Sequence, residues 1–192
     1  MRYGTIALLS ATALALAGCG HKDETTTTTN SVTESGSTTV ADNSVVAVPV
    51  ASAGQAFANT AAASDAFEIA ESQLAATSAH SAAIKSFAQK MITAHTGSTA
   101  KLMTTAAGLT PAITPDATLT ADQQQKVDAL KTKTGADFDT AYAADQVAAH
   151  EAALEALRTY SASGDVPELK TFATGLIATV TAHLNMAKGL KP

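Results

Sequence analysis

The strongest constraint on the fold is a set of four long segments in which apolar residues recur every three or four positions. In residues 81–107, for example, Phe87, Met91 and His95 follow one another at four-residue spacing, so they share one helical face. Similar stripes run through residues 52–78, 137–162 and 165–188. Alanine, the best helix former, is abundant in all four segments. These patterns predict an all-α domain with four inward-facing stripes.

The segments between these helices select one bundle topology. The links near residues 78–81 and 163–165 are short, so each joins two antiparallel neighbours. The connection between residues 107 and 137 is long, and Thr120 with Gln123 forms a capping signature that opens a short helix within it. Each long helix spans about 40 Å, which this connection can cross. We therefore expect a ferritin-like four-helix bundle with one long crossover carrying a short extra helix.

Three of the five histidines and one glutamate are candidate metal ligands. Each predicted long helix places one such residue on its inward stripe: Glu68, His95, His150 and His183. Three imidazoles and one carboxylate suit Zn, Fe, Cu or Mn. The set differs from that of di-iron bundles, because no Glu-x-x-His occurs on any predicted helix. We expect His21 and His80 to lie in solvent.

Counting residues from the predicted turns places the four candidates at unequal depths. Glu68 lies about four residues nearer to the first turn than His95, a mismatch of about 6 Å at 1.5 Å per residue. The same histidines also fit a hydrogen-bonded polar core that includes Tyr142, Asp145 or Glu71. The residues alone leave a metal site, a polar core network and chance placement open.

The first 50 residues are typical of targeting and tethering sequence. Arg2 precedes an apolar run that ends in "LAGC" at Cys19, which resembles a bacterial lipobox. This resemblance implies a signal peptide over residues 1–18 and a lipid attached to Cys19. Residues 19–50 are rich in Thr and Ser and are expected to form a disordered tether, which leaves residues 51–192 as the bundle domain.

The lipobox also predicts where the protein is located. Gly20, rather than Asp, follows the cysteine, which by resemblance to Gram-negative sorting rules favours the outer membrane. We therefore expect a lipoprotein of the bacterial cell envelope that contacts the membrane through Cys19 and faces the periplasm. Cys19 is the only cysteine, so no disulfide forms within the chain.

Composition and motifs argue against several functions. The net charge is −5 and the 12 Lys and Arg residues are scattered, so no nucleic acid partner is expected. The sequence has no G-x-S-x-G, no H-E-x-x-H and no cysteine nucleophile in the domain, so a hydrolase is disfavoured. A non-enzymatic role is favoured, and enzymatic activity of another class stays open. The sequence identifies no protein partner and is compatible with an oligomer.

Four stretches of the domain together resemble a known family. They are "AFEIAESQLA" from residue 66, "IKSFAQKMITAH" from 84, "GADFDTAYAADQVAAHEAAL" from 135 and "ELKTFATGLIATVTAHL" from 168. The chain resembles, over residues 57–190, an uncharacterised bacterial family labelled "predicted outer membrane protein" (domain of unknown function 4142). The resemblance implies a ferritin-like fold, and the family has no settled activity. Its recurrent positions correspond here to Glu68, His95, Tyr142, Gln146, His150 and His183.

One departure from that family bears on the site. The family tends to place Asp directly before the histidine of the second helix, where this chain has Ala94. The departure removes one possible carboxylate partner for the ring of His95. The expected function is that of an envelope lipoprotein whose bundle core binds a transition metal for sequestration or stress protection. The alternative is a non-catalytic structural or interaction lipoprotein whose buried His and Glu form a polar core network.

Overall fold

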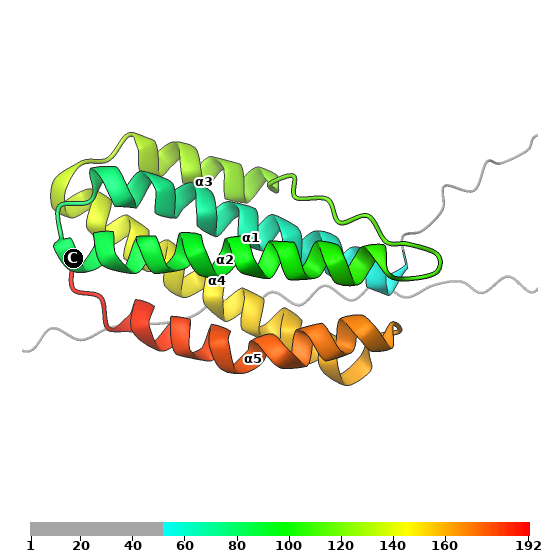
Figure 1. Cartoon of the computed structure of the whole chain (residues 1–192). Coiled ribbons are helices and arrows are strands. Elements are labelled where there is room, and N and C mark those ends of the chain that lie inside the picture. Colours follow the sequence, from blue (N-terminus) through cyan, green and yellow to red (C-terminus); the bar gives the residue numbers. More distant parts are fainter. Residues whose placement is uncertain (1–51) are drawn as a thin grey trace, which may run out of the picture. The chain divides into compact units, whose positions relative to one another are not determined.

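The computed structural model describes residues 52–192, and its regular structure there is helical throughout (Figure 1). Five helices follow one another in this range: α1 (Ala53–Ser78), α2 (Ala82–Ala107), α3 (Ala121–Lys131), α4 (Gly135–Ser163) and α5 (Pro167–Lys188). The predicted signal peptide, the lipid on Cys19 and the tether over residues 19–50 lie outside the described residues.

The long helices form a bundle of two antiparallel hairpins. α1 pairs with α2, α4 pairs with α5, and α1 also packs against α4 as α5 does against α2. A long connection carrying α3 runs back along the bundle, so α2 and α4 point in the same direction (Figure 1). The predicted all-α bundle with one long crossover and a short extra helix is confirmed, whereas its place in the ferritin-like group stays a prediction.

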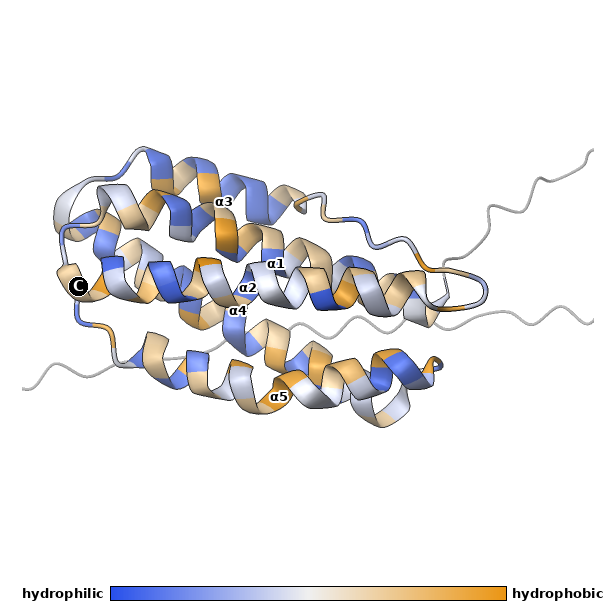
Figure 2. Ribbon diagram, viewed as in Figure 1, coloured by the Kyte–Doolittle hydropathy of each residue, from blue (hydrophilic) through white to orange (hydrophobic). Residues whose placement is uncertain are grey.

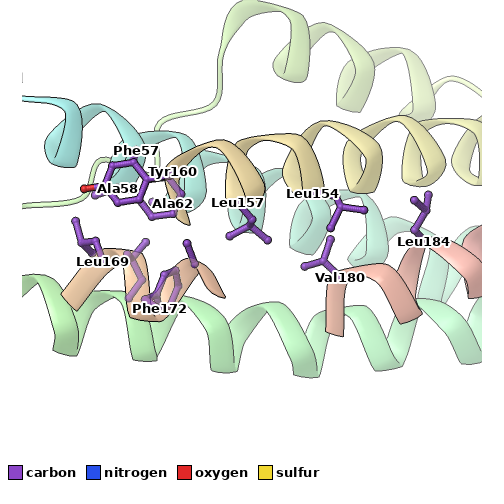
Figure 3. Close-up of a cluster of buried hydrophobic side chains, with 12 residues drawn as sticks. Phe57, Ala58, Ala62, Leu154, Leu157, Tyr160, Leu169, Phe172, Val180 and Leu184 are labelled. Carbon is purple, nitrogen blue, oxygen red and sulfur yellow. The ribbon is translucent and has the colours of Figure 1, made fainter. Parts of the chain in front are cut away.

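Two apolar clusters fill the core, one toward each end of the bundle. The Phe57 cluster, drawn in Figure 3, consists of Phe57, Ala58, Ala62, Leu102, Leu154, Leu157, Tyr160, Leu169, Phe172, Ala173, Val180 and Leu184. The Phe138 cluster consists of Ala75, Ala79, Ile84, Phe87, Ala88, Met91, Leu130, Phe138, Tyr142 and Ala187. In the first cluster the rings of Phe57 and Tyr160 stack with centroids 4.0 Å apart. The predicted stripes therefore face the core.

A layer of buried polar side chains lies between the two apolar clusters. In α1, α2 and α4 the sequence passes from one cluster to the other through this layer, whereas in α5 His183 lies between Val180 and Leu184 of the Phe57 cluster. The layer comprises Asp65, Glu68, Glu71, Ser72, His95, Gln146, His150 and His183. We call these eight residues the polar layer. Burying so many polar groups is unfavourable unless they find partners. The contacts within this layer therefore make it the candidate functional site of the bundle.

The starts of α3 and α5 are capped differently. Thr120 and Gln123 make the reciprocal hydrogen bonds of a capping box at the start of α3, as predicted. The N-cap residue of α5 is Val166, whose side chain makes no capping hydrogen bond. The Asp165 carboxylate instead accepts a hydrogen bond from the Tyr160 hydroxyl at 2.9 Å. That bond ties the end of α4 to the turn before α5.

A buried carboxylate from α4 holds the turn between α1 and α2. The Asp139 side chain accepts hydrogen bonds from the backbone N–H groups of His80, at 2.9 Å, and Ser81, at 2.7 Å. Ser81 is the N-cap residue of α2, but its side chain makes no capping hydrogen bond. At the end of the short α3–α4 link, Gly135 has a φ of 58°, a conformation that favours glycine. Both features fix how α4 meets the first hairpin.

Hydrophilic residues interrupt every labelled helix (Figure 2). Within residues 52–192 no helix combines the length and the apolar character that a membrane span requires.

Candidate metal site

Three histidines from three helices meet in the polar layer. His95 of α2, His150 of α4 and His183 of α5 have ring centroids 5.5 to 5.8 Å apart, which is close to an equilateral triangle. One nitrogen from each ring lies within 4.8 Å of the other two. All three side chains are buried. The rings thus meet at one level of the bundle, although sequence counting placed them at different depths.

The direction of the side chains explains why they meet at the same depth. Every Cα–Cβ bond of an α-helix leans toward the helix N-terminus. His95, the deeper residue of the first hairpin, therefore leans toward the turn, whereas Glu68 on α1 leans away from it. The same reasoning applies to His183 and His150 on the second hairpin. In each antiparallel pair the two side chains therefore lean toward a common depth, which reduces the difference in depth that residue counting gives.

Glu68, the fourth predicted ligand, faces two of the three histidines. Its Oε2 atom lies 2.9 Å from Nε2 of His95 and 3.2 Å from Nε2 of His150. The Glu68 side chain is completely buried. The structure therefore brings together all four side chains that the sequence singled out, with the carboxylate oxygen between two imidazole nitrogens.

A carboxylate that sequence reasoning missed orients the His95 ring. Nδ1 of His95 donates to Oδ1 of Asp65 at 2.7 Å, and Thr99 Oγ1 donates to the other oxygen of that carboxylate at 3.1 Å. Ala94 offers His95 no carboxylate, and Asp65 on α1 supplies one instead. The three-residue spacing of Asp65, Glu68 and Glu71 on the inward face was the available signal.

The backbone orients the second ring in the same way. Nδ1 of His150 donates to the carbonyl oxygen of Gln146 at 2.8 Å. In both His95 and His150 the hydrogen bond at Nδ1 fixes the ring so that Nε2 faces Glu68. Such an outer hydrogen bond to one ring nitrogen is the usual arrangement when the other nitrogen binds a metal.

The atoms that converge here have no hydrogen-bond partners among the described residues. They are both carboxylate oxygens of Glu68, Nε2 of His95, Nε2 of His150 and Nδ1 of His183. Oε2 of Glu68 lies within ion-pair distance of two of these nitrogens, Nε2 of His95 and Nε2 of His150. A buried polar atom without a partner typically costs about 1–3 kcal/mol. Five such atoms in one place form a donor set suited to a cation.

The electrostatic surroundings separate the protonation behaviour of two of these rings. Burial alone would lower the pKa of His95, but the charge of Glu68 and the hydrogen bond to Asp65 outweigh it and raise that pKa to about 10. For His183, burial and then the neighbouring charges of His95 and His150 lower the pKa to about 4. At neutral pH the His183 ring is therefore neutral, and the His95 ring carries a second proton.

The side chains of Glu71, Ser72 and Gln146 in the polar layer bond to partners other than the histidines. Burial, followed by the negative charge of Asp145, raises the pKa of Glu71 to about 8. Gln146 Nε2 donates to Oε2 of Glu71 at 3.3 Å. The Tyr142 hydroxyl pairs with Ser72 at 2.9 Å and not with a histidine. Of the polar partners that the sequence suggested for the histidines, Tyr142, Asp145 and Glu71 therefore bind elsewhere.

The remaining described histidine differs from these three. His80 lies in the α1–α2 turn and is exposed, as expected, so it offers a natural comparison for the buried rings. The fifth, His21, lies outside the described residues.

Comparisons with known proteins agree with the fold. Residues 40–190 match the model of a family described as "Domain of unknown function (DUF4142)". Among curated proteins none matches the chain in sequence. The solved structure described as "CopM in the Cu(II)-bound form" is similar to this one with a TM-score of 0.60 and 16% sequence identity, over 71% of this chain and 93% of that one. At that identity the likeness concerns the fold alone.

Proposed function

We propose that this chain, which belongs to the DUF4142 family, binds one transition metal ion in its bundle core through His95, His150, His183 and Glu68. One observation carries the proposal: a nitrogen atom from each of three buried imidazoles lies within 4.8 Å of the others, beside a buried carboxylate, and these atoms have no hydrogen-bond partners. Ligand atoms bonded at about 2.0–2.1 Å to one ion would lie closer together, so small ring rotations complete the site.

The donor set favours metals that accept imidazole nitrogen. Three imidazoles and a carboxylate, without a thiolate, suit Cu(II), Zn(II), Fe(II) or Mn(II). The likeness to a helical protein described in its Cu(II)-bound form supports copper as the first metal to test. The order of intrinsic affinities among divalent first-row ions also places Cu(II) highest.

The proposed cellular role is metal sequestration or stress protection by an envelope lipoprotein. The "LAGC" stretch supports a lipid on Cys19, and Gly20 supports the outer membrane as the destination. We expect Cys19→Ala to move the protein from the membrane fraction to the soluble fraction of the cell. A variant that stays in the membrane fraction contradicts the lipid anchor and leaves the metal site unaffected.

Metal analysis of the full-length chain, purified without a polyhistidine tag, tests the site. The metal-free protein is offered Cu(II), Zn(II), Fe(II) or Mn(II), freed of excess ion by gel filtration and analysed by mass spectrometry of the elements. We expect about one retained ion per chain for at least one metal, and a higher Tm in its presence. No retained ion and no change in Tm with any of the four overturns the proposal.

Matched variants assign the binding to the buried rings. His150→Gln should lose the retained ion, whereas His80→Gln, which changes an exposed histidine, should keep it. Circular dichroism establishes that both variants remain helical. The alternative, a polar core without a metal, predicts instead that His95→Leu is tolerated or stabilising and that no ion is retained, because an apolar replacement of buried polar groups can be neutral.

A further inference from the structure

The proposed metal site adjoins a cavity that the four ligands do not fill. Its volume is about 160 Å³, and its walls come from all five helices of the described chain. Asp65, His95 and His183 form part of one wall. Glu68 and His150 are not among the lining residues and are completely buried. The cavity therefore meets the site from the side of His95 and His183.

Most of the remaining wall is small or apolar. Alanines occur where larger side chains would close the space, notably Ala61 on α1 and Ala156 on α4. Phe57 and Leu157, from the Phe57 cluster, extend the apolar part of the wall. An apolar cavity of about 150 Å³ is large enough to hold benzene. The space beside the histidines is thus the size of one six-membered ring.

We propose that this cavity is the binding site for a small ligand with one lone-pair donor and a compact apolar body, which completes the coordination of the metal. The inference rests on the proposed metal site. Three imidazoles and one carboxylate supply four protein ligands, and a tetragonal copper(II) site has room for a further ligand beyond four. The donor atom would point toward His95 and His183, and the apolar body would lie against the alanines.

The chemistry of the walls sets the class of ligand. A strongly hydrated anion would lose its water shell among mainly apolar side chains, which is unfavourable without new partners. A purely apolar molecule would not use the metal. A neutral molecule of about the size of one six-membered ring, with one nitrogen or sulfur donor atom, suits both the metal and the apolar side chains of the cavity. Pyridine has the shape of benzene with one lone pair and is the probe that matches these features.

The test uses the full-length chain loaded with Cu(II), after the retained copper has been counted. Pyridine is titrated while the visible absorption and the electron paramagnetic resonance of copper are recorded. We expect a saturable change in both spectra. We also expect 4-tert-butylpyridine, which has the same donor but a bulkier body, to bind at least about tenfold more weakly, a difference of about 1.4 kcal/mol.

Variants on one helix locate the ligand. Ala156→Leu should fill the cavity and weaken pyridine binding about tenfold or more, because Ala156 is nearly two turns from His150, far enough to spare the metal ligand itself. Ala148→Leu, at an exposed position of α4, should leave binding unchanged. The size series with the two pyridines needs no variant, so it decides the question even if Ala156→Leu does not fold.

Three outcomes overturn the inference. They are copper spectra that do not respond to pyridine, equal binding of both pyridines, and equal effects of the two leucine variants. Each of these can occur with one copper retained per chain, in which case the metal site stands and only the cavity ligand is rejected. A chain that retains no copper rejects both.

Discussion

Nδ1 of His95 lies 2.7 Å from Oδ1 of Asp65, so a carboxylate on α1 sets the orientation of a ring on α2. The opposite nitrogen of that ring faces Glu68 at 2.9 Å. Since Asp65 and Glu68 are three residues apart on one helix, α1 holds the His95 ring from both sides. This arrangement makes Asp65 a positioning residue for the proposed metal site.

Asp65→Asn should weaken metal binding while leaving the four proposed ligands in place. The amide keeps the shape of the side chain but loses the charge that strengthens the hydrogen bond to His95. Loss of such an outer partner typically costs about 10–100-fold in affinity. Competition with a chromophoric chelator measures the change, and Asp122→Asn, at an exposed position of α3, serves as the control. Equal affinities of the two variants contradict this role.

Metal affinity should rise with pH from about 7 to 10. In the metal-free protein His95 has a pKa of about 10, so the metal must displace a proton to use this ring. One displaced proton gives about a tenfold gain in affinity for each pH unit. Chelator competition at several pH values measures the slope, and calorimetry in two buffers of different ionisation enthalpy counts the proton. An affinity independent of pH over this range contradicts the prediction.

Glu68→Gln provides the matched variant for that experiment. The charge of Glu68 is the largest of the contributions that raise the pKa of His95. Without that charge, the ring should lose its proton at lower pH, and the pH-dependent part of the affinity curve should move to lower pH. The variant should also bind metal more weakly, because an amide oxygen replaces a carboxylate ligand. An unchanged curve shows that another group releases the proton.

Glu71→Gln should change how the stability of the metal-free protein depends on pH. The pKa of Glu71 is about 8 in the folded protein, against 4.5 for an unperturbed glutamate, so the folded protein binds this proton more tightly than the unfolded chain does. The resulting stability is complete below about pH 4.5 and is lost as the pH rises through 8.

Glutamine does not titrate, so the variant should lose less stability between about pH 5 and 9 than the wild type, by up to about 4 kcal/mol. Urea unfolding at the two pH values measures this difference. Glu155→Gln, which alters an exposed glutamate on α4, should follow the wild-type profile. Parallel profiles for Glu71→Gln and the wild type contradict the assignment.

Asp139→Ala should destabilise the fold without altering the site. The carboxylate accepts two backbone hydrogen bonds from the α1–α2 turn, and its removal leaves those N–H groups without their partner. We expect a loss of about 2–4 kcal/mol, with the metal still retained by folded protein. Thermal unfolding gives the loss, and Asp137→Ala at an exposed position of the same helix should have a smaller effect. Similar losses for both variants contradict the role of Asp139.

Sequence periodicity predicted the inward faces well because it follows directly from helix geometry. Phe87, Met91 and His95 share one face in the structure as they do by spacing. The long connection with Thr120 predicted the crossover and its short helix, since loop length limits which helices can be neighbours. These inferences need only the pattern within one segment.

Contacts between different helices could not be predicted from the periodicity within one segment. Asp65 contacts His95, and Asp139 contacts the α1–α2 turn, and in both cases the partners come from different segments. The pattern within one helix does not specify how far that helix is shifted along its neighbour. The apparent mismatch in depth between Glu68 and His95 arose in the same way, because residue counting ignores the direction in which side chains lean. The cavity beside the histidines depends on small residues from several helices at once, which a stripe pattern does not record.

The position of the polar layer between two apolar clusters also bears on how the helices choose their alignment. The alanine-rich faces of these helices are nearly alike from turn to turn. Shifting one helix along its neighbours by one turn, about 5.4 Å, therefore changes their packing little. For α5 the same slide would move His183 toward apolar side chains and away from His95 and His150. The proposed ligands therefore also select one register of the helices among several registers of nearly equal packing energy.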